Sequence, residues 1–201
     1  MMKVEKMVLL VILMVGGLLL YFQNIDTALF NLINIRLANP VLDVLMISLT
    51  YLGYWPLWIL VAAGLWFKKK RREAALILVG ILLGEGIVTL VKYSIMRPSP
   101  SAIISNARVL EHGLVSSEPS FPSGHTEAAS SMFAVLGDKI SKSRIPLLFI
   151  VIIVGFSRIY VGAHWPTDVL VGGVLGYLVG GGTIRLESRI ERFLIRVGIK
   201  L

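Results

Sequence analysis

The chain alternates long apolar runs with short charged segments, and this alternation limits the folds that it can adopt. Residues 7–22, 74–91 and 166–184 each contain at most one charged side chain. A helix needs about 17–25 mostly apolar residues to cross a bilayer. Only 16% of the residues are charged and the mean hydropathy is +0.80, whereas soluble domains carry about 25% charged residues. The sequence therefore predicts an integral membrane protein.

Two segments of the chain are expected to lie at the membrane surface rather than across the membrane. Residues 24–50 hold turn formers and two aspartates, which favours short interfacial helices. Residues 185–201 place apolar positions at helical spacing among five basic residues, which is typical of an amphipathic surface helix on the cytoplasmic side. The chain, 1–201, is thus predicted to be a single all-α domain with interfacial helices and six transmembrane helices. The predicted spans are residues 7–22, 54–67, 74–91, 122–136, 145–161 and 166–184.

The first of these spans also resembles a signal peptide. No small-x-small cleavage site follows it, so we expect it to be retained. The chain has no cysteine, which excludes disulfide and thiol chemistry.

The basic residues are distributed as in a membrane protein. The net charge is +8, but Lys and Arg form short runs between apolar segments instead of one exposed face, so we expect no nucleic-acid partner. Residues 1–6, 68–73, 138–144 and 185–201 fall on one side of a six-span chain and hold 15 of the 20 basic residues. The positive-inside rule makes that side cytoplasmic. Four of the other five cluster at the opposite, extracytoplasmic side. The five are Arg36, Lys92, Arg97, Arg108 and Arg158.

Glycines recur at four-residue spacing in the last predicted span, at Gly172, Gly176 and Gly180. Such spacing lets two helices approach closely, either inside a bundle or between subunits. We expect packing inside the bundle.

Polar and ionisable side chains gather at the predicted outer ends of several spans. Ionisable groups at the edge of a membrane are costly, so they usually mark a functional site. A bundle would bring these ends around one cavity, where facing cations need an anion between them. Phosphate fits, because guanidinium and ammonium groups match its oxygens. The residues concerned are Lys92, Arg97, Ser123, Gly124, His125, Arg158, His164 and Asp168.

Two local patterns supply groups for proton transfer and attack. The stretch PSGH at 122–125 starts a helix with Pro, and Ser and Gly then leave backbone N–H groups to face an anion beside His125. His164 and Asp168 are four residues apart, so they are neighbours on one helix face. A carboxylate bonded to one ring nitrogen fixes the tautomer and leaves the other nitrogen free. His164 is therefore expected to be a nucleophile or a base.

Lys92, the PSGH stretch and residues 157–168 together resemble the three signature motifs of the type 2 phosphatidate phosphatase (lipid phosphate phosphatase) superfamily. The resemblance covers about residues 40–184 and is complete in the second and third motifs. It implies a six-helix membrane bundle whose core is shared with vanadium haloperoxidases. It also implies a phosphatase for lipid phosphomonoester or pyrophosphate headgroups. Prenyl diphosphates, phosphatidate and phosphatidylglycerol phosphate remain open as substrates.

The resemblance implies a role for each site residue. His164 would be the nucleophile that forms a phosphohistidine, held by Asp168, and His125 would be the general acid for the leaving group. No metal or other cofactor would be needed, and the site would face the extracytoplasmic side. Phosphate oxygens would be held by Lys92, Ser123, Gly124 and Arg158.

The first motif departs from the family pattern of Lys, six residues and Arg-Pro. Ser99 and Pro100 stand at the Arg-Pro position after Lys92, and Arg97 lies two residues earlier. Either Arg97 or Arg108 reaches the phosphate instead, or the site works with one cation fewer. We expect Arg97 to bind the phosphate. With one cation fewer, the site would lose a charge-assisted hydrogen bond worth about 1.5–3 kcal/mol, which would lower the affinity or the rate.

Other candidates have simpler explanations. His112 is expected to be an ordinary hydrogen-bonding residue, and no pair among the three histidines has the close spacing of a zinc site. Glu85 is expected to hydrogen-bond within the bundle or to pair with a cation, and Trp58 and Trp165 are expected at membrane interfaces. Two other functions stay open. One is a phosphotransferase of the same fold, and the other is a non-catalytic lipid-binding protein.

Overall fold

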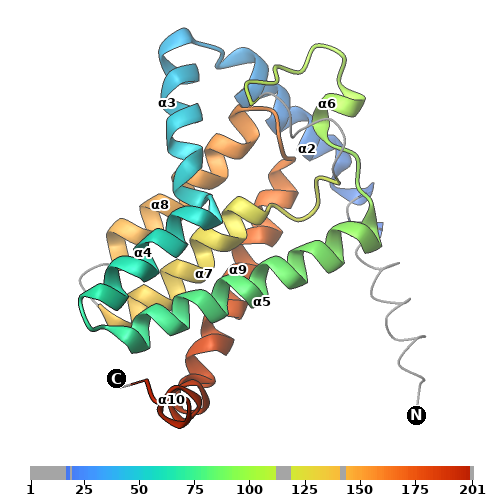
Figure 1. Ribbon diagram of the computed structural model, residues 1–201. Helices are drawn as coiled ribbons and strands as arrows, with labels where there is room; N and C mark the ends of the chain where they lie inside the picture. Colours follow the sequence, from blue (N-terminus) through green and yellow to red (C-terminus); the bar gives the residue numbers. More distant parts are fainter. Residues whose placement is uncertain (1–16, 19, 112–118, 141–143, 200–201) are drawn as a thin grey trace, which may run out of the picture.

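The computed structural model describes residues 17–18, 20–111, 119–140 and 144–199. Within these ranges the chain is helical with short connections and contains no strand. The elements (Figure 1) are α2 (Gln23–Phe30), a π-helical segment (Asn31–Arg36), α3 (Pro40–Thr50), a 3-10 turn (Tyr51–Gly53), α4 (Trp55–Phe67), α5 (Arg71–Ile95), α6 (Pro100–Ile103), α7 (Gly124–Lys139), α8 (Arg144–Tyr160), α9 (Pro166–Arg185) and α10 (Glu187–Arg196).

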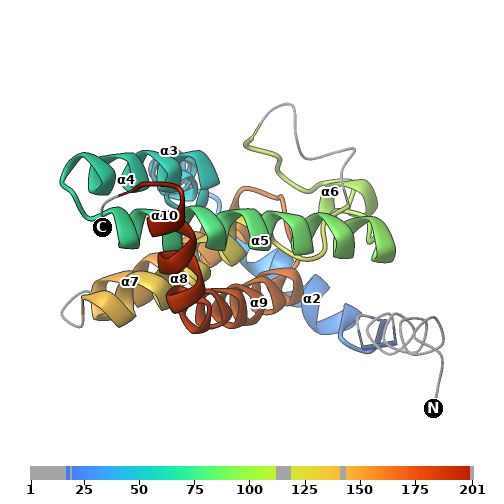
Figure 2. The ribbon, with the colours of Figure 1, turned by 60° about the horizontal axis from the view of Figure 1, so that its bottom comes forward.

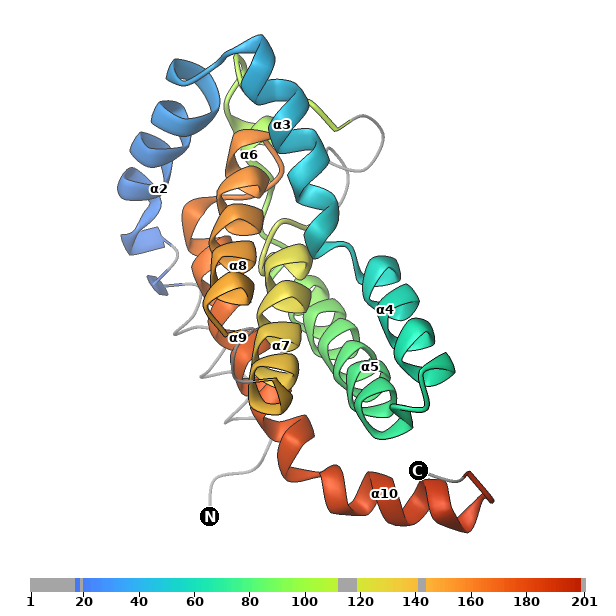
Figure 3. The same cartoon turned by 90° about the vertical axis from the view of Figure 1, so that its left-hand side faces the viewer.

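Helix α7 is the centre of the bundle. It contacts α5, α8 and α9, and α4 packs on α5. Figure 3 shows α2 and α3 as a V at one end of these helices, while α10 lies across the other end, which comes forward in Figure 2. The largest buried cluster includes Trp58, Ile77, Ile81 and Met132, where α4, α5 and α7 meet. The bundle therefore has one end formed by the connections before α7 and α9, and an opposite end covered by α10.

Helix α9 approaches α7 through its glycines. A Cβ atom at Gly172, Gly176 or Gly180 would overlap the backbone carbonyl oxygen of Ser123, Glu127 or Ser131 on α7. Only glycine permits this separation of the two backbones. The predicted packing role of the glycine spacing is confirmed.

The predicted number of membrane spans is not confirmed. Among the described residues, two stretches are long and apolar enough to cross a membrane, Arg71–Ile103 and Pro166–Arg185. Helices α4, α7 and α8 have 13, 16 and 17 residues. They are about 20–26 Å long at 1.5 Å per residue, which is shorter than the roughly 30 Å hydrocarbon core. The predicted span 7–22 lies mostly outside the described residues.

Residues 24–50 are largely helical, as expected, but they form a bent pair rather than separate surface pieces. The chain bends by 118° between Gln23–Arg36 and Pro40–Gly53. Together the two segments are long and apolar enough to form one broken membrane span. The pair also carries inward-facing polar groups. The Asn34 amide donates to the carbonyl oxygens of Tyr160 (2.8 Å) and Arg108 (2.9 Å), which ties this segment to the end of α8.

Local signals set the helix ends that matter for the site. Ser123 caps α7, because its hydroxyl oxygen accepts from the N–H of Thr126. Helix α9 starts at Pro166, a favoured first residue. Helix α5 ends at Ile95, and the next residue, Met96, has a left-handed backbone (φ 52°) that turns the chain sharply before Arg97. The connections that follow α5 and α8 therefore leave their helices in defined directions.

Two tryptophans are not interface anchors, contrary to expectation. Trp58 lies in the main core, and Trp165 is buried against Phe30 and donates its indole N–H to the Pro98 carbonyl (3.0 Å). Both rings fill space between helices, which a hydropathy pattern alone does not distinguish from an interface position. Helix α10 forms within the predicted tail, and Glu187 joins it to Arg72 and Lys139 through ion pairs of 2.6 Å.

Candidate active site

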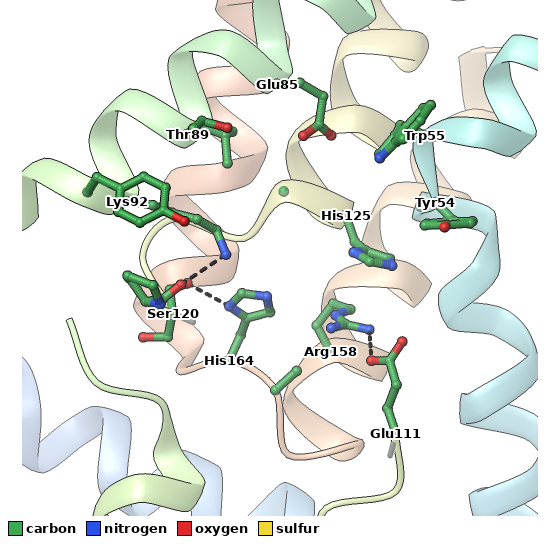
Figure 4. A pocket seen from close by; sticks show the side chains of 16 residues that line it. Tyr54, Trp55, Glu85, Thr89, Lys92, Glu111, Ser120, His125, Arg158 and His164 are labelled. Atoms are coloured by element: carbon green, nitrogen blue, oxygen red, sulfur yellow. Dashed lines mark hydrogen bonds and ion pairs between the residues drawn. The ribbon is translucent and has the colours of Figure 1, made fainter. Parts of the chain in front are cut away.

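A cavity of about 410 Å³ lies beside the starts of α4 and α7. Figure 4 shows the side chains that surround it. The cavity receives residues from the start of α4, the second half of α5, the start of α7, the end of α8 and the connection before α9. Its lining includes Lys92, Gly124, His125, Arg158 and His164. Five of the eight residues singled out in the sequence thus meet around one space.

His164 is held through its Nδ1 atom. This nitrogen lies 2.7 Å from the backbone carbonyl oxygen of Ser120. A carbonyl can only accept, so Nδ1 carries the proton, and the Nε2 atom of a neutral ring keeps its lone pair. The tautomer of His164 is therefore the one that a nucleophile needs.

Asp168 lies beside His164 at a longer distance than expected. Its Oδ2 atom is 3.7 Å from His164 Nδ1, which is too long for a hydrogen bond. The same oxygen accepts from the backbone N–H of Trp165 (2.9 Å). The carboxylate acts on the imidazole through its charge and through the backbone next to His164, while the Ser120 carbonyl orients the ring.

His164 lies in the short connection between α8 and α9 and is buried. Burial holds the pKa of its imidazole below the ordinary value, and Arg158 adds to the lowering against the opposing charge of Asp168. A lowered pKa keeps the ring neutral to lower pH, so the lone pair of Nε2 is available at neutral pH.

His125 is the second residue of α7, and its ring is stacked on Tyr54 with centroids 5.8 Å apart. Neither of its ring nitrogens hydrogen-bonds to another described residue. Ser123 satisfies the N–H groups of Thr126 and Glu127, while no described residue accepts from those of Gly124 and His125. The start of α7 therefore offers two backbone donors and an imidazole to a bound anion.

Two cations face the cavity. The Lys92 ammonium donates to the Pro119 carbonyl (2.9 Å). Arg158 donates from one nitrogen to the Thr50 hydroxyl (2.9 Å) and to the Glu111 carboxylate (2.6 Å), as Figure 4 shows for the second contact. Guanidinium and ammonium groups in this position match the oxygens of a phosphate.

Three expected phosphate ligands or substitutes lie outside the cavity lining. Ser123 is buried and serves as the cap of α7. Arg97 binds the carboxylates of Asp26 and Asp168 instead, because the turn at Met96 directs it behind the start of α9. Arg108 pairs with Asp43 on α3 and stacks on Tyr160. Among the described residues, the cavity lining therefore contains Lys92 and Arg158 but neither Arg97 nor Arg108.

Several cavity residues were not foreseen. Glu111 pairs with Arg158 and Ser120 orients His164, yet both belong to a polar connection with no helical periodicity. Glu85 lines the cavity, a position that its spacing from Lys92 on α5 could have suggested. His112 lies outside the described residues. No group of three or more His, Asp or Glu side chains within the described ranges is placed to hold a metal ion.

Residues 73–192 match the family model described as the PAP2 superfamily. The chain belongs to the PAP2 superfamily. The matched stretch is more than half of the chain and contains Lys92, His125, Arg158, His164 and Asp168, so the family suggested by the three sequence motifs is confirmed.

Individual relatives cover most of the chain. It is 33% identical to an undecaprenyl-diphosphatase of Sulfolobus acidocaldarius over 86% of both chains. It is 29% identical to phosphatidylglycerophosphatase B of Bacillus subtilis over 79% of this chain and 82% of the relative. Among solved structures, it is similar to a transmembrane PAP2-type phosphatidylglycerolphosphate phosphatase from Bacillus subtilis. That likeness has a TM-score of 0.73 and 26% identity, and it covers 96% of this chain and all of the other.

Proposed function

We propose that this protein hydrolyses the phosphomonoester or pyrophosphate headgroup of a membrane lipid through a phosphohistidine on His164. The general class, a lipid phosphate or diphosphate hydrolase of the membrane, rests on membership of the PAP2 superfamily and on relatives named as lipid phosphatases. The observation that carries the mechanism is the hydrogen bond between His164 Nδ1 and the Ser120 carbonyl, which leaves Nε2 with its lone pair.

In the first step, Nε2 of neutral His164 attacks phosphorus. The bond from phosphorus to the leaving oxygen breaks, and protonated His125 gives that oxygen its proton. In the second step, water attacks the phosphohistidine and gives a proton to His125. The bond from phosphorus to nitrogen breaks, inorganic phosphate leaves, and both rings return to their starting states.

The charge that develops on the phosphoryl oxygens is met by Lys92, by Arg158 and by the N–H groups at the start of α7. Such preorganised donors supply most of the catalysis in phosphoryl transfer. Asp168 stabilises the positive charge that forms on His164. Only side chains and backbone groups take part, so we expect the rate to be unchanged by EDTA.

An apolar groove beside the cavity supports a lipid substrate. A depression of about 400 Å³ between α4 and α5 shares Trp55 and Glu85 with the cavity. A second depression, of about 220 Å³, shares Ile59 and Leu78 with the first and continues toward the far ends of the same helices. Apart from Glu85, the lining is apolar or aromatic, which suits a hydrocarbon chain whose headgroup lies at His164.

The proposed orientation places the cavity at the extracytoplasmic face of a six-span, single-domain chain, with residues 40–184 as the core. Helix α10 and the turn between α4 and α5 lie at one end of the bundle (Figure 3), and both segments carry several basic residues. The cavity is lined by the starts of α4 and α7, so the positive-inside rule supports this orientation. A cysteine introduced near the cavity, such as Tyr93→Cys, would then react with an impermeant thiol reagent in whole cells. Protection of that cysteine until the cells are opened would reverse the orientation.

The test is phosphate release by purified protein in detergent from undecaprenyl diphosphate, phosphatidate and phosphatidylglycerol phosphate. We expect release from at least one of them, with and without EDTA, and none from the His164→Ala variant. A phosphorylated acceptor without free phosphate would indicate a transferase. Absence of both products with every lipid would reject the proposed function.

A further inference from the structure

Arg97 lies next to the proposed site but is not part of the cavity lining. Its Nη1 donates to Asp168 Oδ1 (2.5 Å) and to the Thr167 hydroxyl (2.7 Å), and its Nη2 donates to Asp26 Oδ2 (2.6 Å). The guanidinium also lies 5.3 Å from the centre of the Trp165 ring. A single side chain therefore connects α2 with the first turn of α9.

Both carboxylates of this bridge are fully buried. Asp26 also accepts from the backbone N–H (2.9 Å) and the hydroxyl (2.5 Å) of Thr167. A carboxylate removed from water persists only when it is paired and hydrogen-bonded. A substrate phosphate would have to separate Arg97 from two such partners, so Arg97 is committed to the bridge.

Asp168 links the bridge to the chemistry. Its Oδ1 atom is bound by Arg97, and its Oδ2 atom accepts from the backbone N–H of Trp165, the residue that follows His164. Oδ2 is also the oxygen 3.7 Å from His164 Nδ1. With one oxygen fixed by Arg97, the carboxylate cannot rotate, and the distance from its charge to the imidazole is set.

We propose that Asp26 and Arg97 are positioning residues for the reaction, which hold the Asp168 carboxylate in the orientation that serves His164. The inference rests on the proposed function of His164. Asp26 lies outside residues 73–192, the stretch that matches the family model. Asp26, in the segment before the matched residues, thus helps to orient a catalytic group within them.

The first experiment compares Arg97→Gln, Asp26→Asn and the double variant in steady-state phosphate release, on the lipid that the wild type hydrolyses fastest. We expect Arg97→Gln to lower kcat by about 10- to 100-fold, as orienting partners of active groups commonly do, with KM within about 3-fold. Asp26→Asn should lower kcat less, and the double variant should be no slower than Arg97→Gln, since both act through one carboxylate. Calorimetry with inorganic phosphate should give the wild-type affinity in all three.

Arg108→Gln is the matched control. Arg108 also pairs with an aspartate and stacks on an aromatic ring, but it is not connected to Asp168. This variant should lose thermal stability in the same way and keep its kcat. Arg97→Lys, which keeps the charge and can reach only one carboxylate well, should recover part of the kcat and covers the case in which Arg97→Gln does not fold.

Three results would overturn the proposal. A large rise in KM and a weaker affinity for inorganic phosphate in Arg97→Gln, with Asp26→Asn at wild-type rates, would make Arg97 a phosphate ligand. Lower stability with unchanged kcat would reduce the bridge to a structural role. Multiplicative losses in the double variant would separate the two residues. If the wild type hydrolyses no lipid, the proposed function fails, and the bridge is tested by NMR titration of His164, whose pKa should rise in Arg97→Gln because Asp168 loses its counter-charge.

Discussion

Two arginines near the same histidine are both largely buried but differ in the exposure of their carboxylate partners. Arg158 faces the cavity, and its carboxylate partner Glu111 has a side chain that is 18% exposed. Arg97 is enclosed by Asp26 and Asp168, both 0% exposed. A partner at the edge of a cavity can yield to an incoming phosphate, whereas two buried carboxylates cannot be left without a counter-charge. We therefore expect an arginine to bind substrate when phosphate can replace its carboxylate partner, and to support the site when both of its carboxylate partners are buried.

The largest expected effect is the loss of phosphate release in His164→Ala, with which the effects of the two arginine variants are compared. His164→Ala removes the proposed nucleophile, so phosphate release should fall by more than about 10⁴-fold, as with other removed nucleophiles. Thermal unfolding should show that the variant is folded. Incubation with lipid labelled in its phosphate, followed by a quench in alkaline detergent, should trap a base-stable, acid-labile phosphoenzyme in the wild type alone. Full turnover in His164→Ala would remove the chemical basis of the comparison.

Arg158→Gln should produce the next largest loss. The substitution removes one charge-assisted contact to the phosphate, worth about 1.5–3 kcal/mol, which corresponds to roughly 10- to 100-fold in kcat/KM. The affinity for inorganic phosphate should fall with it, in contrast to Arg97→Gln. If calorimetry found equal phosphate affinities in Arg158→Gln and the wild type, the two arginines would not differ in phosphate binding.

The structure places Arg158 at the cavity, as the sequence predicts, but places Arg97 outside the cavity lining. The reason for this difference is physical. Arg158 and His164 stand six residues apart in one motif, so a single helix end fixes both. Arg97 is bound by Asp26, 71 residues earlier, and no local sequence pattern indicates that contact. Ser123 lies in the correct motif but is used to cap the helix. Glycine spacing was informative because close packing of two helices requires the same residue at every contact.

The fold was predictable in class and less so in detail. Hydropathy identified the helical segments, since an apolar segment in a bilayer must satisfy its backbone hydrogen bonds internally, as a helix does. It did not give the bend between α2 and α3 or the burial of Trp165, because both depend on which helices face each other. The polar connection before α7, which supplies Ser120, has no periodicity from which its position could be deduced.

The pH profile tests the effect of Arg158 on His164. Burial and Arg158 lower the pKa of His164, so the imidazole stays neutral, and the enzyme active, below the ordinary histidine pKa of about 6.5. Activity should be lost as the pH falls through that lowered pKa. In a protein with His112→Gln and His125→Gln, His164 is the remaining histidine. The rate of its carbethoxylation, followed at 240 nm as a function of pH, reports its neutral fraction.

Arg158→Gln in that background should move the midpoint to higher pH, because removing a positive charge stabilises the imidazolium. Lys139→Gln, which changes a charge at the far end of the bundle, should leave it unchanged. A titration midpoint at or above pH 6.5 in the His112→Gln, His125→Gln protein would contradict the electrostatic account of the site. So would a midpoint that moves to lower pH when Arg158→Gln is added.

The smallest expected effect concerns the exchangeable partner itself. Glu111→Gln keeps a carbonyl oxygen near Arg158 but removes its negative charge, so the guanidinium no longer has to give up an ion pair when phosphate enters. The ion pair lies at the edge of the cavity, with side chains 6% (Arg158) and 18% (Glu111) exposed. We expect phosphate to bind about 2- to 5-fold more tightly by calorimetry, which corresponds to about 0.4–1 kcal/mol.

Glu187→Gln is the control for Glu111→Gln, since it also removes a carboxylate from basic partners, here Arg72 and Lys139 at the α10 end. It should leave the phosphate affinity unchanged. Weaker phosphate binding in Glu111→Gln would mean that the carboxylate orders Arg158 for the substrate instead of competing with it. The two arginines would then both depend on fixed carboxylates, and exchangeability would no longer distinguish them.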